Sequence, residues 1–206
     1  MASQIDIVNL ALLELGEATI ASLTEGTSAA ITMNAIYTIV RQELLRKHRW
    51  SFSRRQANLA ALAALAAEPI WNYSHQIQLP SDCLQLIGIK GYTSDPSYTQ
   101  LGVPDAYPTY QIYGRTIYIN DAGPIYIDYV GDITDTTLFD SAFVTAFAMA
   151  LATRAAQRIT QSNSIAQVAE GKYMQAIRDA VRANAIEIPP VAIQATSYTL
   201  TRSGGG

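Results

Sequence analysis

The chain has 206 residues, of which 49% are apolar and 15% are charged, and its net charge is −3 with a pI of about 5.3. This acidic balance excludes attraction of the whole molecule to DNA or to an anionic membrane, because both are negatively charged. The single cysteine, Cys83, excludes an intrachain disulfide and a metal cluster built on cysteines. The charged share lies below the roughly 25% that is usual for a soluble domain, which favours a surface partly covered by a partner.

Targeting and membrane segments are not expected from the sequence. The N-terminus "MASQIDIVNL" lacks a basic stretch followed by an apolar core, so no signal peptide is predicted. The alanine-rich stretch "ANLAALAALAAEP" is shorter than the about 18 apolar residues that a membrane span requires, so no membrane anchor is predicted.

Two helices are expected at the start of the chain. Ser3 is a good N-cap for a first helix, apolar residues follow at helical spacing, and Gly16 provides the stop. A second helix begins at Thr27 or Ser28 and continues to about His48. At ~1.5 Å per residue this second helix is roughly 30 Å long.

In the middle of the chain, the composition changes to residues that favour β-strands. Residues 57–67 are predicted to form a short helix or an ordered connector, because alanine has a high helix propensity. Strands are then predicted at "HQIQL", "CLQLIGI", "TYQIY", "TIYIN" and "IYIDYV". The Gly114-Arg115 pair favours a two-residue hairpin turn, so residues 109–130 are predicted to form a three-stranded antiparallel meander. Residues 92–108 are predicted to be a long surface loop.

Two further helices are expected near the end of the chain. Helical periodicity returns after Asp140 and restarts at Ser162 or Ser164. Pro189 and Pro190 end the last helix, and the alternating, glycine-terminated segment after them predicts an extended tail with no core of its own.

These elements together predict an α+β fold: an antiparallel four-helix body with an inserted small antiparallel β-sheet domain and an extended C-terminal tail. The predicted domains are 1–70 for the first half of the helical body, 71–132 for the inserted β domain, 133–186 for the second half of the helical body, and 187–206 for the tail.

The sequence contains no nucleotide-binding, zinc-protease or serine-hydrolase motif, so no catalytic residue, cofactor or metal site is predicted. His48, His75 and Cys83 could be drawn as a Cys–His arrangement, but Cys83 begins an apolar strand, which favours an inert buried thiol. Asp135 and Asp140 are interpreted as turn and N-cap residues. A carboxylate pair for glycoside hydrolysis stays an open alternative, although nothing singles out a pair among the 17 acids.

Tyrosine is concentrated in the predicted strands, with eight of the 12 tyrosines between Tyr92 and Tyr129. Such strands could form a stacking platform for bases or sugars. Tyrosine is also a common strand and interface residue, and we favour that interpretation. The neighbouring cations, Lys90 and Arg115, are too few to follow a phosphate backbone.

The stretch "LLRKHRWSFSRR", residues 44–55, contains five of the 14 Lys and Arg residues, interleaved with two aromatic residues. This pattern is typical of a groove for single-stranded nucleic acid. It is equally typical of a helix C-terminus, where cations are favoured by the helix dipole and Trp50 would anchor the exit. Arg54 and Arg55 are not explained by helix capping, and we interpret them as candidates for ion pairs with a neighbouring subunit or a partner.

Four segments resemble a known family, the head-to-tail adaptors, or tail tubular proteins A, of short-tailed bacteriophages. The segments are "LALLELGEATIASLTEG", "VRQELLRKHRWSFSRRQANLA", "LPSDCLQLIGI" and "YVGDITDTTLFDSAFVTAFAMALATRAA", and in order they extend over roughly residues 5–185. The most specific parts are Arg41-Gln42-Glu43-Leu44-Leu45 with His48, Trp50 and Phe52, and the Leu79–Cys83 motif "LPSDC".

The resemblance implies a virion structural protein and not an enzyme. Members of this family form a twelve-membered ring between the portal protein and the tail nozzle protein, at the head–tail interface of a virion assembled in the host cytoplasm, and DNA passes through the ring without specific binding. The alternatives are a tail-associated peptidoglycan hydrolase and a DNA-binding protein that uses residues 46–55. Candidate residues for subunit or portal interaction are Arg46, Lys47, Arg49, Trp50, Phe52, Arg54, Arg55, Pro189, Pro190, Ile193, Tyr198, Leu200 and Arg202.

Overall fold

A computed structural model describes residues 2–60, 73–92, 110–121 and 123–187 of the chain. These residues contain four α-helices and two three-stranded antiparallel sheets. The helices are α1 (Gln4–Glu14), α2 (Ser28–Lys47), α4 (Ser141–Thr160) and α5 (Asn163–Glu187). The strands are β1 (Arg54–Leu59), β2 (His75–Gln78), β3 (Cys83–Ile89), β4 (Tyr110–Tyr113), β5 (Thr116–Ile119) and β6 (Ile125–Gly131).

The predicted helix starts are confirmed by the capping contacts. The Ser3 side chain accepts a hydrogen bond from the Asp6 amide at 3.2 Å, and the Asp6 carboxylate accepts one from the Ser3 amide at 2.8 Å, which completes a capping box. Thr27 caps α2 and Asp140 caps α4 through their side-chain oxygens. These local signals therefore fix where three of the helices begin.

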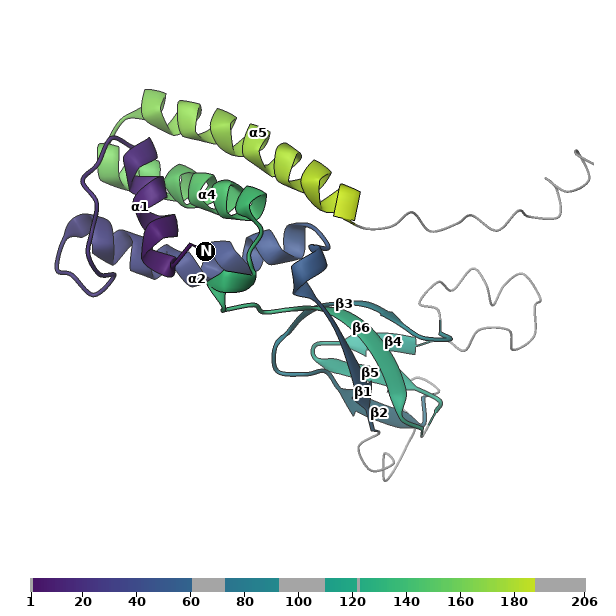
Figure 1. The fold of residues 1–206 in the computed structure, drawn as a ribbon. Helices are drawn as coiled ribbons and strands as arrows, with labels where there is room; N and C mark the ends of the chain where they lie inside the picture. Colours follow the sequence, from purple (N-terminus) through teal and green to yellow (C-terminus); the bar gives the residue numbers. More distant parts are fainter. Residues whose placement is uncertain (1, 61–72, 93–109, 122, 188–206) are drawn as a thin grey trace, which may run out of the picture.

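The helices pack around α4, which contacts α1, α2 and α5 (Figure 1). Six alanines of α4 lie at most 7% exposed in the core. Because alanine side chains are small, they allow the neighbouring helices to approach closely on several sides of α4. Larger groups, Phe143 and Phe147 of α4 together with Met33 of α2, fill the remaining space.

The two sheets pack face to face and form a second core. Their strand orders are β1-β6-β3 and β2-β5-β4, with every neighbouring pair antiparallel. Alternate residues of β6, including Ile125 and Ile127, meet Ile77, Ile117 and Ile119 of the second sheet in this core. The β part lies at one end of the helical layer, and α2 contacts β3 and β6 where the two parts meet (Figure 1).

The predicted architecture, a four-helix body with one small inserted sheet, is wrong. The chain is an α+β mix in which two sheets stand beside the helices. The Gly114-Arg115 turn joins β4 to β5 as predicted, with Gly114 at a φ of 60°. The predicted meander over 109–130 is wrong, because β6 leaves β5 and pairs with β1 and β3.

The burial of the two faces of β6 explains why this strand pairs with β1 and β3 and not with β5. Ile127 and Tyr129 enter the core between the sheets, whereas Val130 packs into the helical core on the other side. One face of β6 is buried along its length, and the other face is buried only at its end, where Val130 lies; such a strand is more stable at the centre of a sheet than at the edge of a hairpin. It therefore takes β1 as a second neighbour, although residues 54–59 fall within the 1–70 range for which the sequence predicts helices.

Residues 57–59 are strand, so the predicted helix or connector over 57–67 is wrong at its start, and its remainder lies outside the described residues. The predicted loop over 92–108 and the predicted tail after Glu187 also lie outside them, apart from Tyr92. Among the described residues, no helix combines the length and the apolar character needed to cross a membrane.

Candidate interaction site at the helix–sheet junction

Arg41 joins the helical layer to the sheets through Asp132, which directly follows β6. Its guanidinium donates hydrogen bonds of 3.3 Å from Nε and of 2.9 and 3.2 Å from one terminal nitrogen to the Asp132 carboxylate. The neighbouring Gln42 amide donates a further bond of 2.8 Å to the same carboxylate. The side chains of Arg41 and Asp132 are 9% and 20% exposed, so both charges are largely removed from water and neutralise each other.

Asp82 extends this network to the "LPSDC" segment. Its carbonyl oxygen accepts a 2.7 Å bond from the Asp132 amide, and its carboxylate accepts bonds from Arg55 at 2.7 Å and from the Tyr129 hydroxyl at 3.3 Å. Burial and the adjacent Asp82 carboxylate raise the pKa of Tyr129. The Asp82 segment, the end of β6 and the start of β1 are thereby held in one place.

The exit from α2 is anchored by Trp50, as the sequence predicts. Trp50 is 1% exposed, and its indole nitrogen donates a 2.9 Å hydrogen bond to the Leu44 carbonyl. Its ring contacts Phe143 of α4 edge-on at 5.0 Å between centroids, and Phe52 contacts both Phe139 and Phe143. Trp50 is thus part of the core of the single chain, and Phe52 is half-buried against it.

His48 and Asn184 connect the same exit to the last turns of α5. The Asn184 carboxamide oxygen accepts a 2.7 Å bond from the Ser51 amide, so its nitrogen faces the His48 Nε2 at 2.9 Å. His48 Nε2 must therefore be the acceptor, which requires a neutral ring. Burial and the neighbouring Arg49 lower the pKa of His48, in agreement with this assignment.

The basic residues of the 46–55 segment do not form one continuous charged strip. Arg54 pairs with Asp128 and Arg55 with Asp82, both within the same chain, and successive strand residues point to opposite faces. Lys47 donates a 2.9 Å bond to the Tyr173 hydroxyl. Arg46 and Arg49 are exposed and have no ion pair among the residues that the structure describes.

The other candidates from the sequence cannot be placed. Pro189, Pro190, Ile193, Tyr198, Leu200 and Arg202 all lie outside the described residues.

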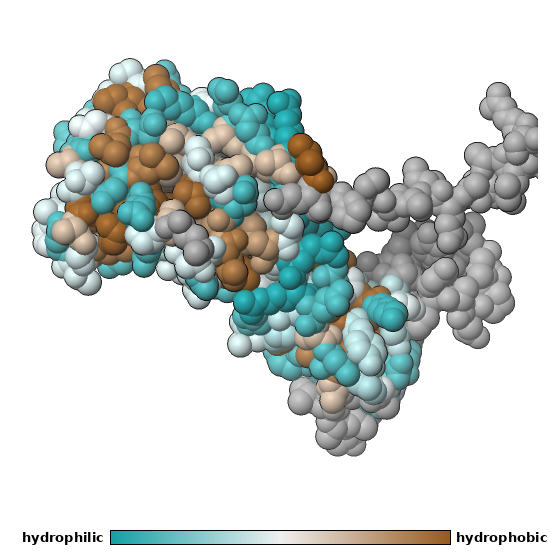
Figure 2. All heavy atoms as spheres, viewed as in Figure 1, coloured by the Kyte–Doolittle hydropathy of each residue, from teal (hydrophilic) through white to brown (hydrophobic). Residues whose placement is uncertain are grey.

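Apolar side chains gather on the surface of the helical layer, as Figure 2 shows, whereas the β part in the same view is mostly polar. Leu13 of α1 and Val168 of α5 are 61% and 59% exposed, and they line a groove of about 350 Å³ between the two helices. Glu14 and Lys172 form an ion pair at this groove. On α2, Ile31 and Ile39 are also more than half exposed; together these residues offer apolar surface that a partner could cover.

Cys83 lies in the core between the sheets, and its thiol is inert in the sense that the sequence predicts. Burial raises its pKa, so the thiol stays protonated near neutral pH, and a thiol is a poor nucleophile and metal ligand in that form. Within the described ranges, no group of three or more His, Cys, Asp or Glu residues is placed to hold a metal ion.

The site depends on three residues to which the sequence analysis assigned no role. Two of them, Arg41 and Asp132, form the helix–sheet junction, and the third, Asn184, holds the exit from α2. A usable signal existed for Arg41, because it follows the apolar stripe of Met33, Tyr37 and Val40 onto the buried side of α2. A charge on a buried helix face requires a partner of opposite charge. No comparable signal marks Asn184, whose partners come from 133 to 136 residues earlier in the chain.

The comparisons with known proteins return no family model and no curated protein that matches this chain.

Proposed function

We propose that this chain is a virion structural protein, a head-to-tail adaptor of a short-tailed bacteriophage. In this role it assembles as a ring between the portal protein and the tail nozzle protein, at the head–tail interface, and DNA passes through the ring without specific binding. The number of twelve subunits follows from the resemblance described above.

The observation that carries the proposal is the meeting of the resembling segments at one junction. Arg41 belongs to the first specific motif, Asp82 to "LPSDC", and Asp132 to "YVGDITD", and the three are joined by direct hydrogen bonds. Segments 41 to 91 residues apart thus serve one structural purpose, the fixed connection of the helical layer to the sheets. A ring subunit that contacts different partners at its two ends requires such a connection.

The exposed apolar side chains of the helical layer support an assembly of identical copies. Leu13 and Val168 at the α1–α5 groove would be covered by the neighbouring copy in the ring. The low charged share of the chain agrees with this, because interface cores are depleted in charged residues.

The charge distribution supports a passive channel for DNA. A conduit must not hold its cargo, because each phosphate contact with a lysine or arginine adds affinity. The chain carries a net charge of −3, and Arg54 and Arg55 are engaged by aspartates of the same chain. No contact of the described residues favours a hydrolase or a DNA-binding protein over this role.

The ring is tested by electron microscopy and native mass spectrometry of the full chain, alone and mixed with the portal protein encoded by the same genome. We expect rings, with the portal or without it. Leu13→Asp and Val168→Asp place a charge in the groove and should abolish the rings, whereas Gln167→Asp adds the same charge at an exposed polar position of α5 and should not. A chain that stays monomeric and does not bind the portal would contradict the proposal.

A further inference from the structure

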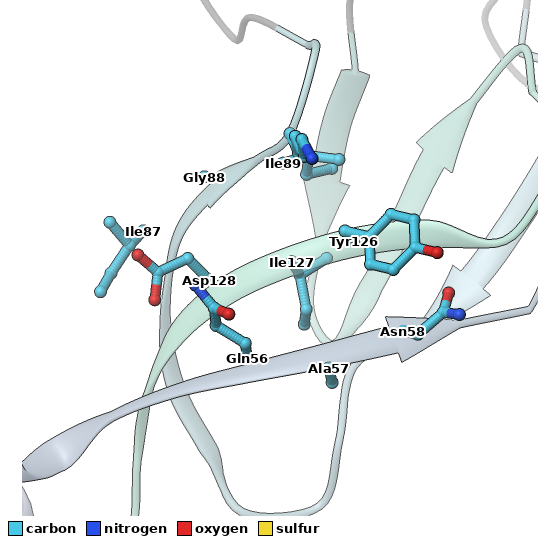
Figure 3. A pocket seen from close by; sticks show the side chains of 10 residues that line it. Gln56, Ala57, Asn58, Ile87, Gly88, Ile89, Tyr126, Ile127 and Asp128 are labelled. Atoms are coloured by element: carbon cyan, nitrogen blue, oxygen red, sulfur yellow. The ribbon is translucent and has the colours of Figure 1, made fainter.

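A concave pocket of about 590 Å³ lies on the β1-β6-β3 sheet (Figure 3). The side chains of Tyr126 and Asp128 point to the face of β6 opposite Ile125, Ile127 and Tyr129, which face the second sheet. Tyr126 is 56% exposed, so this part of the face is open. The volume falls within the about 300–1,000 Å³ that is usual for small-molecule sites.

The strand register arranges the lining residues in two rows across the three strands. Gln56 of β1 and Gly88 of β3 both pair with Asp128, which makes the first row. In the second row, Asn58 pairs with Tyr126, and the backbone amide of Lys90 donates a 2.9 Å bond to the Tyr126 carbonyl.

A β-bulge and the missing side chain of Gly88 create the empty space above the first row. The register of β3 shifts between Leu86 and Gly88, so Ile87 is an extra residue that stands at the side of the pocket. A β-carbon built on Gly88 would meet no atom within 4 Å. The space above the centre of the sheet is therefore available to a ligand, and a larger side chain at position 88 would fill it.

Two carboxamides that face this space, those of Gln56 and Asn58, make no hydrogen bond inside the described part of the chain. Both side chains are exposed, so a ligand can replace the water that they bind. Asp128 Oδ1 has no hydrogen-bond partner among the described residues either, but this atom is buried, so Asp128 forms part of the wall of the pocket and does not reach the ligand.

The charges around the pocket disfavour a cation. Arg54 and Asp128 neutralise each other in their ion pair, whereas the Lys90 ammonium, whose nitrogen lies 5.9 Å from the centre of the Tyr126 ring, would repel a cation. A neutral molecule with many hydroxyl groups avoids this repulsion and uses both hydrogen-bonding capacities of the carboxamides.

We propose that this pocket binds a neutral saccharide. Sugar hydroxyls exchange hydrogen bonds with the carboxamides of Gln56 and Asn58, and the Tyr126 ring forms an apolar wall for the C–H groups of a pyranose. The pocket lies within one chain, so sugar binding and ring assembly can each be present or absent without the other.

The test is a titration of the ¹⁵N-labelled full chain carrying Leu13→Asp and Val168→Asp, the changes expected to keep it monomeric, with two neutral sugars, chitotriose and maltotriose, each up to about 20 mM. Chitotriose represents amino-sugar polymers and maltotriose represents glucans. We expect one of them to cause saturable shifts of the Gln56 and Asn58 side-chain amides and of the Gly88 amide. Asn58→Ala and Gly88→Leu should each weaken binding at least tenfold, whereas Gln111→Ala, an exposed change on β4, should not.

Two results would overturn the proposal: no saturable shift with either sugar, or binding unchanged in both pocket variants. A third would be shifts of the same amides with arginine ethyl ester and not with the sugars, which would make the pocket a site for a cationic side chain. If Gly88→Leu fails to fold, Asn58→Ala decides alone, because Asn58 is exposed and its truncation removes no core packing.

Discussion

Arg41 and Asp132, 91 residues apart in the chain, are joined by three hydrogen bonds at 2.9–3.3 Å, with side chains 9% and 20% exposed. The pair connects α2 to the end of β6, and Gln42 and the Asp82 carbonyl bond to the same aspartate. It is the most buried ion pair among those of the described residues.

Replacing Arg41 by Met should destabilise the fold by about 3 kcal/mol, because the Asp132 carboxylate would then be left without its cation in a poorly hydrated place. The value is at the low end for buried pairs, since Asp132 is 20% exposed. Urea unfolding followed by circular dichroism measures the change.

Arg154→Met is the matched control, because the Arg154–Glu43 pair has side chains 57% and 50% exposed. It should cost at most about 1 kcal/mol. The double variant Arg41→Met/Asp132→Leu should be more stable than Arg41→Met alone, because it removes the unpaired charge. Equal costs for Arg41→Met and Arg154→Met would show that the junction pair contributes no more than a surface pair.

Trp50→Ala should cost about 3–5 kcal/mol, because it empties a buried space beside Phe52 and Phe143. Trp50→Phe keeps an aromatic ring but leaves the Leu44 carbonyl without its donor, so it should cost less. Thermal and urea unfolding of both variants check the order. A cost below 1 kcal/mol for the alanine variant would be incompatible with a buried anchor.

The stability of the fold should fall as the pH drops below about 6.5. The ordinary pKa of histidine is 6.5, and burial lowers the pKa of His48 in the folded chain, so the unfolded chain takes up a proton first. Protonation also removes the Nε2 acceptor that Asn184 uses. Urea unfolding between pH 5 and pH 8 measures the slope.

His48→Gln should flatten that slope, since glutamine does not titrate in this range. Unfolding of the unchanged chain at each pH is the reference for this comparison. An unchanged slope in the His48 variant would assign the pH dependence to another group.

Removing residues 188–206 should leave a folded protein that no longer docks on the portal protein. The sequence of this segment alternates and has no core of its own, so we expect it to gain structure only on a partner surface. Pull-down with the portal protein measures docking, and circular dichroism shows that the truncated chain is folded. Docking of the truncated chain at the level of the full chain would assign the portal contact to another surface.

Arg54→Ala and Arg55→Ala should each lower stability by less than about 1 kcal/mol and should leave ring assembly intact. Both arginines are more than 40% exposed and are paired with aspartates of their own chain. Mass photometry of the two variants measures assembly. Loss of the rings in either variant would restore the interpretation of these residues as subunit contacts.

The local signals of the sequence were sufficient for the helices and for the position of most strands. Ser3, Thr27 and Asp140 cap the helices as predicted, and Gly114 forms the predicted turn. Such signals act over a few residues, and they do not depend on the rest of the fold.

Strand partners were not predictable in the same way. Nothing in "RRQANL" marks a strand, because it contains no β-branched or aromatic residue, and β1 forms because β6 requires a second neighbour. The pairing of Arg54 with Asp128 and of Arg55 with Asp82 follows from that register, so it could not be seen before the strand was known. The pocket at Gly88 depends in the same way on a bulge between β3 and β6.

The most direct test of the proposed adaptor role is a reconstruction of the intact virion by electron cryo-microscopy. We expect twelve copies of this chain in a ring around the DNA channel, between the portal protein and the nozzle protein, with the helical layers in mutual contact. Density for the chain at any other place in the particle, or its absence from the particle, would contradict it.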